Sequence, residues 1–363
     1  MVLLRPVIRR VKTVAEHLAP PVRRAHQTSA AATCTAGGES STPAAPASSR
    51  IVSSMSEVAQ YYDAFILDQW GVLHDGSNAM DGAVECLAAL AAAGKQLIIL
   101  SNDGARKASG MTGVSRLSKM GFDTSSLVGS VLAGEEAIQW MLREYGGRRT
   151  KCTWMAWSSH GFESKYIDGL DLELVSFEET ELIIAQGTAR LVTSAADLHA
   201  EPTRNLQYSK SGEIDEVAAG LRAAAARDAL LVCCNPDLKT VKRTSSGAEV
   251  VEYCPGGMAR FYESCGGRVM WFGKPYREHF EASIRQLGIE DKSRVAMVGD
   301  ALETDILGAN NAGIDSVLVA SGIHGDALQC TTGVHPPAQS DVVKLCNEFG
   351  GITPTFVVPR FVW

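Results

Sequence analysis

The sequence of 363 residues has no uninterrupted run of about 18 or more apolar residues, although 45% of its residues are hydrophobic. A helix needs about 20 mostly apolar residues to cross a bilayer, so we expect no transmembrane helix and no membrane partner. Basic residues are also few: 34 Lys and Arg stand against 41 Asp and Glu, for a formal net charge of −7. Without a broad basic surface, nucleic acid is not an expected partner.

The nine cysteines lack the spacing of a zinc site or of a redox CxxC pair. They are scattered from Cys34 to Cys346 and their number is odd, so the pattern predicts free thiols in a reducing compartment. The glycine-rich segment 254–267 lacks the spacing of a dinucleotide fingerprint after a strand. The sequence therefore predicts neither a disulfide framework, nor structural zinc, nor a bound dinucleotide.

Residues 1–50 differ from the rest of the chain in composition. Their seven basic residues are opposed by only Glu16 and Glu39, and residues 27–49 are rich in Ala, Ser, Thr, Pro and Gly. The basic residues are Arg5, Arg9, Arg10, Lys12, Arg23, Arg24 and Arg50. Among those before residue 24, apolar residues recur at helical spacing: Val7, Ile8, Val11, Val14 and Leu18. Such a tract cannot bury a core, so we expect it to be disordered.

A basic amphipathic start followed by a Ser/Ala tract is typical of an organelle transit peptide. The early arginines favour the mitochondrion as the destination, with the plastid as the alternative. If residues 1–50 are a plain tail without a targeting role, the expected location is the cytoplasm.

Four short apolar runs end in polar residues or glycine. They lie at 64–67 before Asp68, 96–100 before Ser101, 294–298 before Gly299 and 316–320 before Ser321. Each has the length of a buried strand, and helical patterns lie between them, at 83–95 and at 277–288. This alternation predicts an α/β fold with a Rossmann-like, doubly wound parallel sheet. Ligands bind such sheets at the carboxyl ends of the strands, where Asp68, Ser101 and Asp300 are expected.

The middle of the chain, residues 129–265, has its own alternation of apolar runs and helical stretches. A block of this size between two strands of one sheet has to leave the first domain and enter it again. We therefore predict a core domain built from residues 56–128 and 266–363, and an inserted α/β cap domain, 129–265, above the sheet edge.

Two motifs supply carboxylates at the ends of the predicted strands. Asp68 follows its strand directly, where an Asp can attack phosphorus and form an aspartyl-phosphate; the alternative is a cap of the next helix. Asp300 and Asp305 follow another strand, and Asp305 has the alternative role of anchoring a helix start. Three converging carboxylates would repel one another, and Mg²⁺, which takes hard oxygen ligands, resolves that conflict.

Two weaker motifs supply groups for an anion. Ser101 and Asn102 carry a hydroxyl and an amide that can hold phosphoryl oxygens, although Ser-Asn after a strand is usually a turn. Lys274 precedes a predicted helix, where its charge can neutralise a transferring phosphoryl group, although Pro275 fits the first turn of any helix.

The order of these motifs resembles the haloacid dehalogenase superfamily. It is most similar to the class IIA branch, which contains nucleotide and sugar phosphatases and phosphoglycolate or pyridoxal phosphate phosphatases. The resemblance spans roughly residues 61–322 and includes CNPD at 234–237. It implies a magnesium-dependent hydrolase acting on a small phosphorylated metabolite, with a class II cap that selects the substrate. Caps of this branch often pair, so a homodimer through the cap is also expected.

The resemblance also implies a role for each motif residue. Asp68 is expected to be the nucleophile and a metal ligand. The metal is further held by Asp300, with Asp305 in support, and by the backbone carbonyl of Trp70. Ser101 and Lys274 are expected to bind the phosphate.

Position 70 departs from the family pattern, which usually has a second Asp there to protonate the leaving alcohol. Indole exchanges no proton near neutral pH, and loss of general acid–base help costs about 10²–10⁴ in rate. We expect Asp75 to substitute as the acid, with His74 and Asp103 as further candidates. Alternatively, the substrate has a good leaving group, such as an acyl phosphate, or the protein is a weak or inactive pseudoenzyme that binds a phosphorylated ligand. Trp70 itself either packs beneath the cap or offers a stacking surface.

Overall fold

The computed structural model describes residues 49–106, 113–157, 164–198, 205–243 and 249–363. These residues belong to a unit that begins at Ala45. The predicted transit peptide lies outside the described residues except for Ser49 and Arg50, and Arg50 begins a strand. Among the residues described, no helix combines the length and the apolar character needed to cross a membrane.

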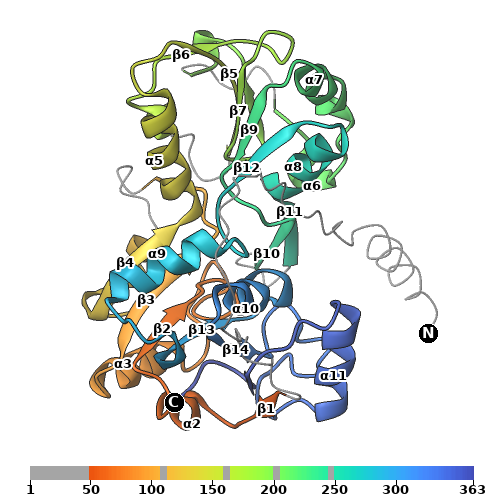
Figure 1. Ribbon diagram of the computed structural model, residues 1–363. Helices are drawn as coiled ribbons and strands as arrows, with labels where there is room; N and C mark the ends of the chain where they lie inside the picture. Colours follow the sequence, from red (N-terminus) through yellow and green to blue (C-terminus); the bar gives the residue numbers. More distant parts are fainter. Residues whose placement is uncertain (1–48, 107–112, 158–163, 199–204, 244–248) are drawn as a thin grey trace, which may run out of the picture. The chain divides into compact units, whose positions relative to one another are not determined.

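Seven parallel strands form the first sheet, in the order β1-β15-β14-β13-β2-β3-β4 (Figure 1). Their bounds are β1 Arg50–Ile51, β2 Ala64–Leu67, β3 Gln96–Ser101, β4 Leu127–Leu132, β13 Val295–Gly299, β14 Asp315–Val319 and β15 Phe356–Val358. The chain builds outward from β2 in one direction through β3 and β4, and in the other through β13 and β14. This reversal creates a switch point between β2 and β13, the place where open α/β sheets bind ligands.

Helices cover both faces of this sheet because successive strand residues point to opposite sides. Phe65 and Leu67 of β2 pack in one cluster with α3, whereas Ile66 packs with α9 and α10 on the other face. The helices are α2 Met55–Ala59, α3 Ala83–Ala92, α4 Gly113–Lys119, α9 Arg277–Leu287, α10 Leu307–Ala312 and α11 Gln339–Glu348. Each fully buried large apolar side chain contributes about 1.5–3 kcal/mol. The prediction of a doubly wound α/β fold is confirmed.

A second sheet has the order β12-β9-β7-β5-β6, with β8 antiparallel to β5. Its strands are β5 Thr150–Ala156, β6 Leu172–Leu174, β7 Leu182–Ala185, β8 Arg190–Val192, β9 Leu230–Cys233 and β12 Arg268–Trp271; its helices are α5 Ala133–Tyr145, α6 Tyr208–Ser211, α7 Asp215–Ala226 and α8 Pro255–Ser264. One face packs against α5 and the other against α7 and α8. The hairpin of β10 (Lys239–Arg243) and β11 (Glu249–Tyr253) is separate from both sheets.

Five short helical turns complete the described elements. They are the 3-10 turns η2 Thr124–Ser126, η3 Ser164–Ile167, η4 Ala195–Leu198 and η5 Lys292–Arg294, and the π-helical turn η6 Leu302–Ile306.

The boundaries between the sheets differ from those expected at 128/129 and 265/266. β4 continues through Gly129 to Leu132, so the chain leaves the first sheet only after residue 132. Gly266 lies in a turn rather than in a linker, because β12 begins at Arg268 and pairs in parallel with β9. The chain therefore returns to the first sheet only after Trp271.

The helix predicted at 83–95 is shorter than expected. It ends at Ala92, and Gly94 follows with φ +74°, a left-handed conformation that glycine adopts without steric cost. The helix predicted at 277–288 ends in the same way at Gly288, with φ +68°.

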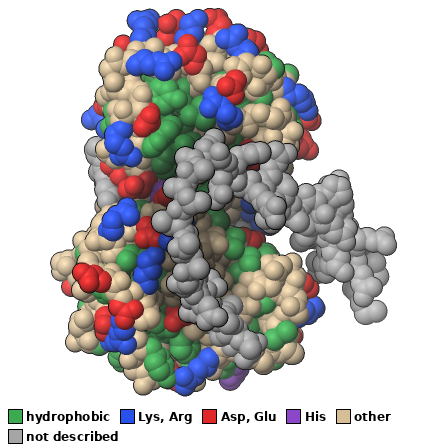
Figure 2. Space-filling model, viewed as in Figure 1, with side chains coloured by type: hydrophobic (Ala, Val, Ile, Leu, Met, Phe, Trp, Pro, Cys, Tyr) green, Lys and Arg blue, Asp and Glu red, His purple; other side chains and the backbone are tan. Residues whose placement is uncertain are grey.

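Charged side chains of both signs are interspersed on the described part of the face in Figure 2, and neither sign forms a broad patch there.

Candidate active site

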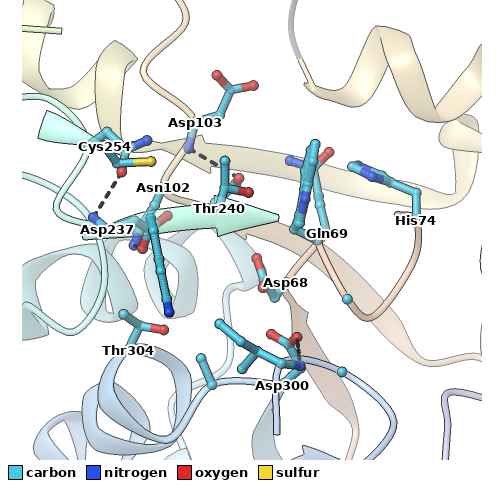
Figure 3. A pocket seen from close by; sticks show the side chains of 18 of the residues that line it. Asp68, Gln69, His74, Asn102, Asp103, Asp237, Thr240, Cys254, Asp300 and Thr304 are labelled. Carbon is cyan, nitrogen blue, oxygen red and sulfur yellow. Dashed lines mark hydrogen bonds between the residues drawn. The ribbon is translucent and has the colours of Figure 1, made fainter. Parts of the chain in front are cut away.

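Side chains from three neighbouring strands meet at the switch point. Asp68 follows β2, Asp300 follows β13 and Ser101 ends β3. Ligand oxygens of Asp68, Asp300 and Asp305 lie within 4.8 Å of one another, and all three residues are buried. Figure 3 shows Asp68 and Asp300 close together, with Asn102 and Asp237 on one side and His74 on the other. A cavity of about 480 Å³ opens here, a size suited to a small metabolite.

Asp305 holds the loop that presents Asp300. Its Oδ2 accepts backbone N–H groups of Asp300 and Ala301, both at 3.1 Å, from within the π-helical turn η6. Its Oδ1 lies 2.7 Å from Nζ of Lys274. With both carboxylate oxygens engaged, Asp305 is placed to anchor and orient rather than to meet a substrate.

Asp300 lies in a tight cradle of glycines. A Cβ at Gly71 would lie 2.0 Å from Oδ2 of Asp300, and one at Gly322 would lie 2.2 Å from its Cβ. Gly71 also has φ +76°, which side-chain-bearing residues rarely adopt. The Asp300 Oδ2 accepts the backbone N–H of Ile323 at 2.8 Å. The backbone thus fixes this carboxylate from three sides.

Lys274 is the cation of the site. Its Nζ lies 2.6 Å from Oδ1 of Asp68, and only 3% of its side chain is exposed. Burial alone would lower the pKa of Lys274, but the carboxylates of Asp305 and Asp68 raise it overall. Lys274 is therefore protonated, and its charge offsets part of the carboxylate charge.

The carboxylates retain a strong electrostatic conflict. Burial raises the pKa of Asp68; Lys274 opposes this and Asp305 adds to it, which leaves the pKa at about 7. Burial, then the charges of Asp68 and Asp305, raise the pKa of Asp300 well above its usual range. With all three carboxylates ionised, as a bound cation would require, the Lys274 ammonium leaves two negative charges to be balanced. The oxygen donors, their spacing and this residual charge fit one hard divalent cation.

The predicted role of Asn102 is to bind phosphate, but its side chain pairs with Asp237 and with the backbone of Lys274. Its Nδ2 donates to Oδ1 of Asp237 at 2.7 Å and to the Lys274 carbonyl at 3.2 Å, and its Oδ1 accepts the Lys274 N–H at 2.6 Å. An amide has two N–H donors, so Asn102 would reach a phosphoryl oxygen only by giving up one of these bonds. Ser101, in contrast, lines the cavity, and its Oγ accepts the N–H of Asp103 at 3.3 Å.

The Trp70 indole packs on the loop that follows it. Its ring lies 5.1 Å, edge to face, from that of His74, and a Cβ at Gly76 would lie 2.3 Å from its six-membered ring. The residue is partly exposed and lines the cavity. Both predicted roles, packing and a surface for a substrate ring, are compatible with this position.

The three candidate acids, Asp75, His74 and Asp103, also line the cavity. Asp75 Oδ1 accepts the N–H groups of Ser77 and Asn78, at 2.9 and 2.8 Å, so this carboxylate closes a turn. Burial, aided by the charge of Arg116, lowers the pKa of His74 to about 4. Its Nδ1 accepts the N–H of Gly76, so the neutral ring carries its proton on Nε2. Asp103 Oδ1 accepts the N–H of Ala105 at 3.0 Å.

The sequence does not indicate Gln186, Thr240 and Glu252 of the second domain as cavity residues. They have no recurrent spacing, and the hairpin β10–β11 brings the last two opposite each other. The CNPD segment, which Asp237 ends, marked this residue in the sequence. Its contact with Asn102 could not be predicted, because Asn102 lies 135 residues earlier. Arg106 was likewise not identified as a contact to the second domain. Its Nη1 donates to carbonyls of Lys165, Tyr166 and Asp168 at 3.1, 3.1 and 2.8 Å.

Two family models match the chain. One, described as a haloacid dehalogenase-like hydrolase, matches residues 65–166, and another, described as "HAD-hyrolase-like", matches residues 271–344. The two matched segments contain Asp68, Ser101, Lys274, Asp300 and Asp305, whereas the CNPD segment 234–237 lies between them.

Curated relatives align over most of the chain. Chronophin of Bos taurus is 28% identical over 266 residues, which cover 71% of this chain and 81% of that protein. A 4-nitrophenylphosphatase of Schizosaccharomyces pombe is 24% identical over 283 residues, which cover 74% and 86%.

Solved structures share the fold. A haloacid dehalogenase-like hydrolase from Brucella suis 1330 superposes with a TM-score of 0.64 at 22% identity, covering 86% of this chain and all of that one. A glycerol phosphate phosphatase from Mycobacterium tuberculosis, solved in complex with magnesium, has a TM-score of 0.52 at 20% identity and covers 83% and 76%. The order of the motifs, the two sheets and these matches agree: the chain belongs to the haloacid dehalogenase-like hydrolases, in their class IIA branch.

Proposed function

We propose that this protein is a magnesium-dependent phosphohydrolase that acts on a small phosphorylated metabolite through an aspartyl-phosphate on Asp68. One observation carries the proposal. The Asp68 carboxylate lies 2.6 Å from the Lys274 ammonium and clusters with Asp300 and Asp305 at the base of a cavity. The relatives named as a 4-nitrophenylphosphatase and a phosphoglycolate phosphatase support the same reaction class.

Mg²⁺ would be held by the carboxylates of Asp68 and Asp300 and by the backbone carbonyl of Trp70, with Asp305 in support. The ion would offset the repulsion between the Asp68 carboxylate and an approaching phosphoryl group. The Asp300 cradle and the two residual negative charges support this assignment.

The protein side chains carry out the remaining steps. Lys274 and Ser101 bind phosphoryl oxygens and orient phosphorus toward Asp68, whose attack displaces the leaving alcohol. Water then attacks phosphorus and releases phosphate, which regenerates Asp68. We assign Asp75 as the substitute acid because it is a partly exposed carboxylic acid at the cavity.

A second candidate function is binding of a phosphorylated ligand without efficient turnover. Trp70 favours it, because the indole cannot protonate a leaving group at the position where the family usually has an Asp. Retention of Asp68, Lys274, Asp300 and Asp305 favours the hydrolase, since a pure binding module has no chemical need for an intact nucleophile and its cation.

A panel of phosphorylated metabolites, assayed for phosphate release with and without Mg²⁺, tests the proposal. We expect release that requires Mg²⁺ and is lost in Asp68→Asn. Trp70→Asp separates the two candidates: brisk wild-type turnover that this substitution impairs indicates that another residue is the acid. Near-background wild-type turnover that rises strongly in Trp70→Asp supports the binding module.

We further propose a mitochondrial location and a homodimer through the cap. Imaging of a fusion that carries residues 1–50, beside a fusion without them, tests the first. Light scattering of the purified protein tests the second.

A further inference from the structure

A network of polar contacts connects the second domain to the backbone of Lys274. Asn102 is 5% exposed and lies between Asp237 and Lys274. Its amide donates to the Asp237 carboxylate and to the Lys274 carbonyl, and accepts the Lys274 N–H. The side chain therefore pairs with both polar groups of one residue, much as a neighbouring strand would.

These partners leave the Asn102 amide only one favourable orientation. A rotated amide would turn its oxygen toward the Asp237 carboxylate and the Lys274 carbonyl, and its N–H groups toward the Lys274 N–H. Buried polar groups opposed in this way are costly. Asp237 favours the observed amide orientation most strongly, because the bond from Asn102 Nδ2 to Asp237 Oδ1, at 2.7 Å, has a carboxylate as its acceptor.

The two chain segments around Asn102 are built for close approach. Gly273 has φ +108°, and a Cβ there would lie 2.4 Å from Asn102 Oδ1 and 2.8 Å from Pro236 Cδ. The turn that presents Asp237 is itself fixed, since the Asp237 N–H donates to Oδ1 of Asn235 at 2.9 Å. Figure 3 shows Asn102 and Asp237 side by side at the edge of the cavity.

We propose that Asn102 and Asp237 are positioning residues for Lys274. Asp237, from the second domain, fixes the Asn102 amide; the amide fixes the Lys274 backbone; and the Lys274 ammonium meets Asp68 at 2.6 Å. Placement of the active-site cation thus depends on contact with the inserted domain. The catalytic part of this inference rests on the proposed function, whereas the backbone part does not.

Two readouts test the inference. The first is hydrogen–deuterium exchange at the Lys274 amide, which is measured without substrate. The second is steady-state turnover of the best substrate from the phosphorylated panel. Both are applied to the wild type, Asp237→Ala, Asn102→Ala and the double variant, with thermal unfolding as a check of folding.

Arg106→Ala is the matched control. Arg106 also contacts the second domain, through three backbone carbonyls, but none of its described contacts involves Lys274. It therefore reports the effect of loosening the contact between the domains alone.

In Asp237→Ala we expect exchange at Lys274 to quicken about tenfold, the factor that one ordinary hydrogen bond represents. The value of kcat should fall by a similar factor with less change in KM. The double variant should match Asn102→Ala, because both substitutions break one chain of contacts. Asp237→Asn keeps an acceptor oxygen and should retain most of the protection and turnover; it also serves if Asp237→Ala does not fold.

Wild-type exchange at Lys274 in Asp237→Ala would overturn the inference, as would an equal increase in Arg106→Ala. Additive effects in the double variant would do the same. If the wild type shows no turnover, the proposed function fails, but the exchange data still decide whether Asn102 and Asp237 hold Lys274.

Discussion

The Nζ atom of Lys274 lies 2.6 Å from Oδ1 of Asp68, and both side chains are almost fully buried. A buried cation beside a nucleophilic carboxylate serves two purposes. It keeps part of the carboxylate charge compensated before substrate arrives, and it is in place for the charge that develops on a transferring phosphoryl group.

Lys274→Met should therefore reduce turnover strongly. Loss of one preorganised cationic partner is expected to lower kcat by about 10²–10³. The variant should also be less stable, because Asp68 and Asp305 lose their buried partner; breaking such a pair costs about 3–5 kcal/mol. Phosphate release and chemical unfolding measure the two effects. Turnover within a few-fold of wild type would contradict the assigned role.

Asp300→Asn should separate stability from metal binding. Without metal, the substitution removes a carboxyl whose ionised form is disfavoured by burial and by Asp68 and Asp305, so the variant should unfold at a higher temperature than the wild type in chelator. Mg²⁺ at about 100 times its Kd should stabilise the wild type by about 2.7 kcal/mol and the variant much less.

Thermal unfolding with chelator and with Mg²⁺ measures both effects. A variant that gains as much from Mg²⁺ as the wild type would show that Asp300 is not a ligand.

Gly71→Ala should disturb the metal site through Asp300. The new Cβ would lie 2.0 Å from Asp300 Oδ2, and φ +76° adds about 1–2 kcal/mol of backbone strain. Gly94→Ala is the matched control, since Gly94 has φ +74° and a Cβ there meets open space. Both variants should lose stability, but only Gly71→Ala should weaken the stabilisation by Mg²⁺. Equal responses to Mg²⁺ would show that the cradle does not position Asp300.

The main strands and their terminal carboxylates could be predicted because a strand buried on both faces is a continuous apolar run. The runs before Asp68 and Asp300 met that condition, and the parallel order brings their ends together. The contact between Asn102 and Asp237 could not be predicted, because it depends on how the second domain meets the first. Nor does a local pattern indicate the π-helical turn that directs Asp305 back to the Asp300 N–H.

The boundaries expected at 128/129 and 265/266 differ from the observed ends of the strands for a similar reason. Gly129 and the pair Gly266–Gly267 resemble breaks in the sequence, yet β4 runs through the first and β12 starts directly after the second. At Gly129, strand pairing outweighs the low strand preference of glycine.

Stability should fall in mild acid because of His279, which lies outside the proposed active site. Burial lowers its pKa from 6.5 to about 4, against a small opposing effect of Glu278. Below pH 6.5 His279 binds a proton in the unfolded chain but stays neutral in the folded protein. Its contribution to folding stability is therefore fully present above pH 6.5 and is lost as the pH falls toward 4.

His279→Leu should remove this dependence. Between pH 7 and pH 5 the wild type should lose about 2 kcal/mol more stability than the variant, as measured by unfolding at several pH values. Parallel pH profiles would show that His279 does not contribute.

A crystal structure of the wild-type protein grown with Mg²⁺ and phosphate tests the central claim most directly. We expect one ion about 2.1 Å from oxygens of Asp68 and Asp300 and from the Trp70 carbonyl, with phosphate between Asp68, Ser101 and Lys274. An ion bound elsewhere, or phosphate out of reach of Asp68, would contradict the account.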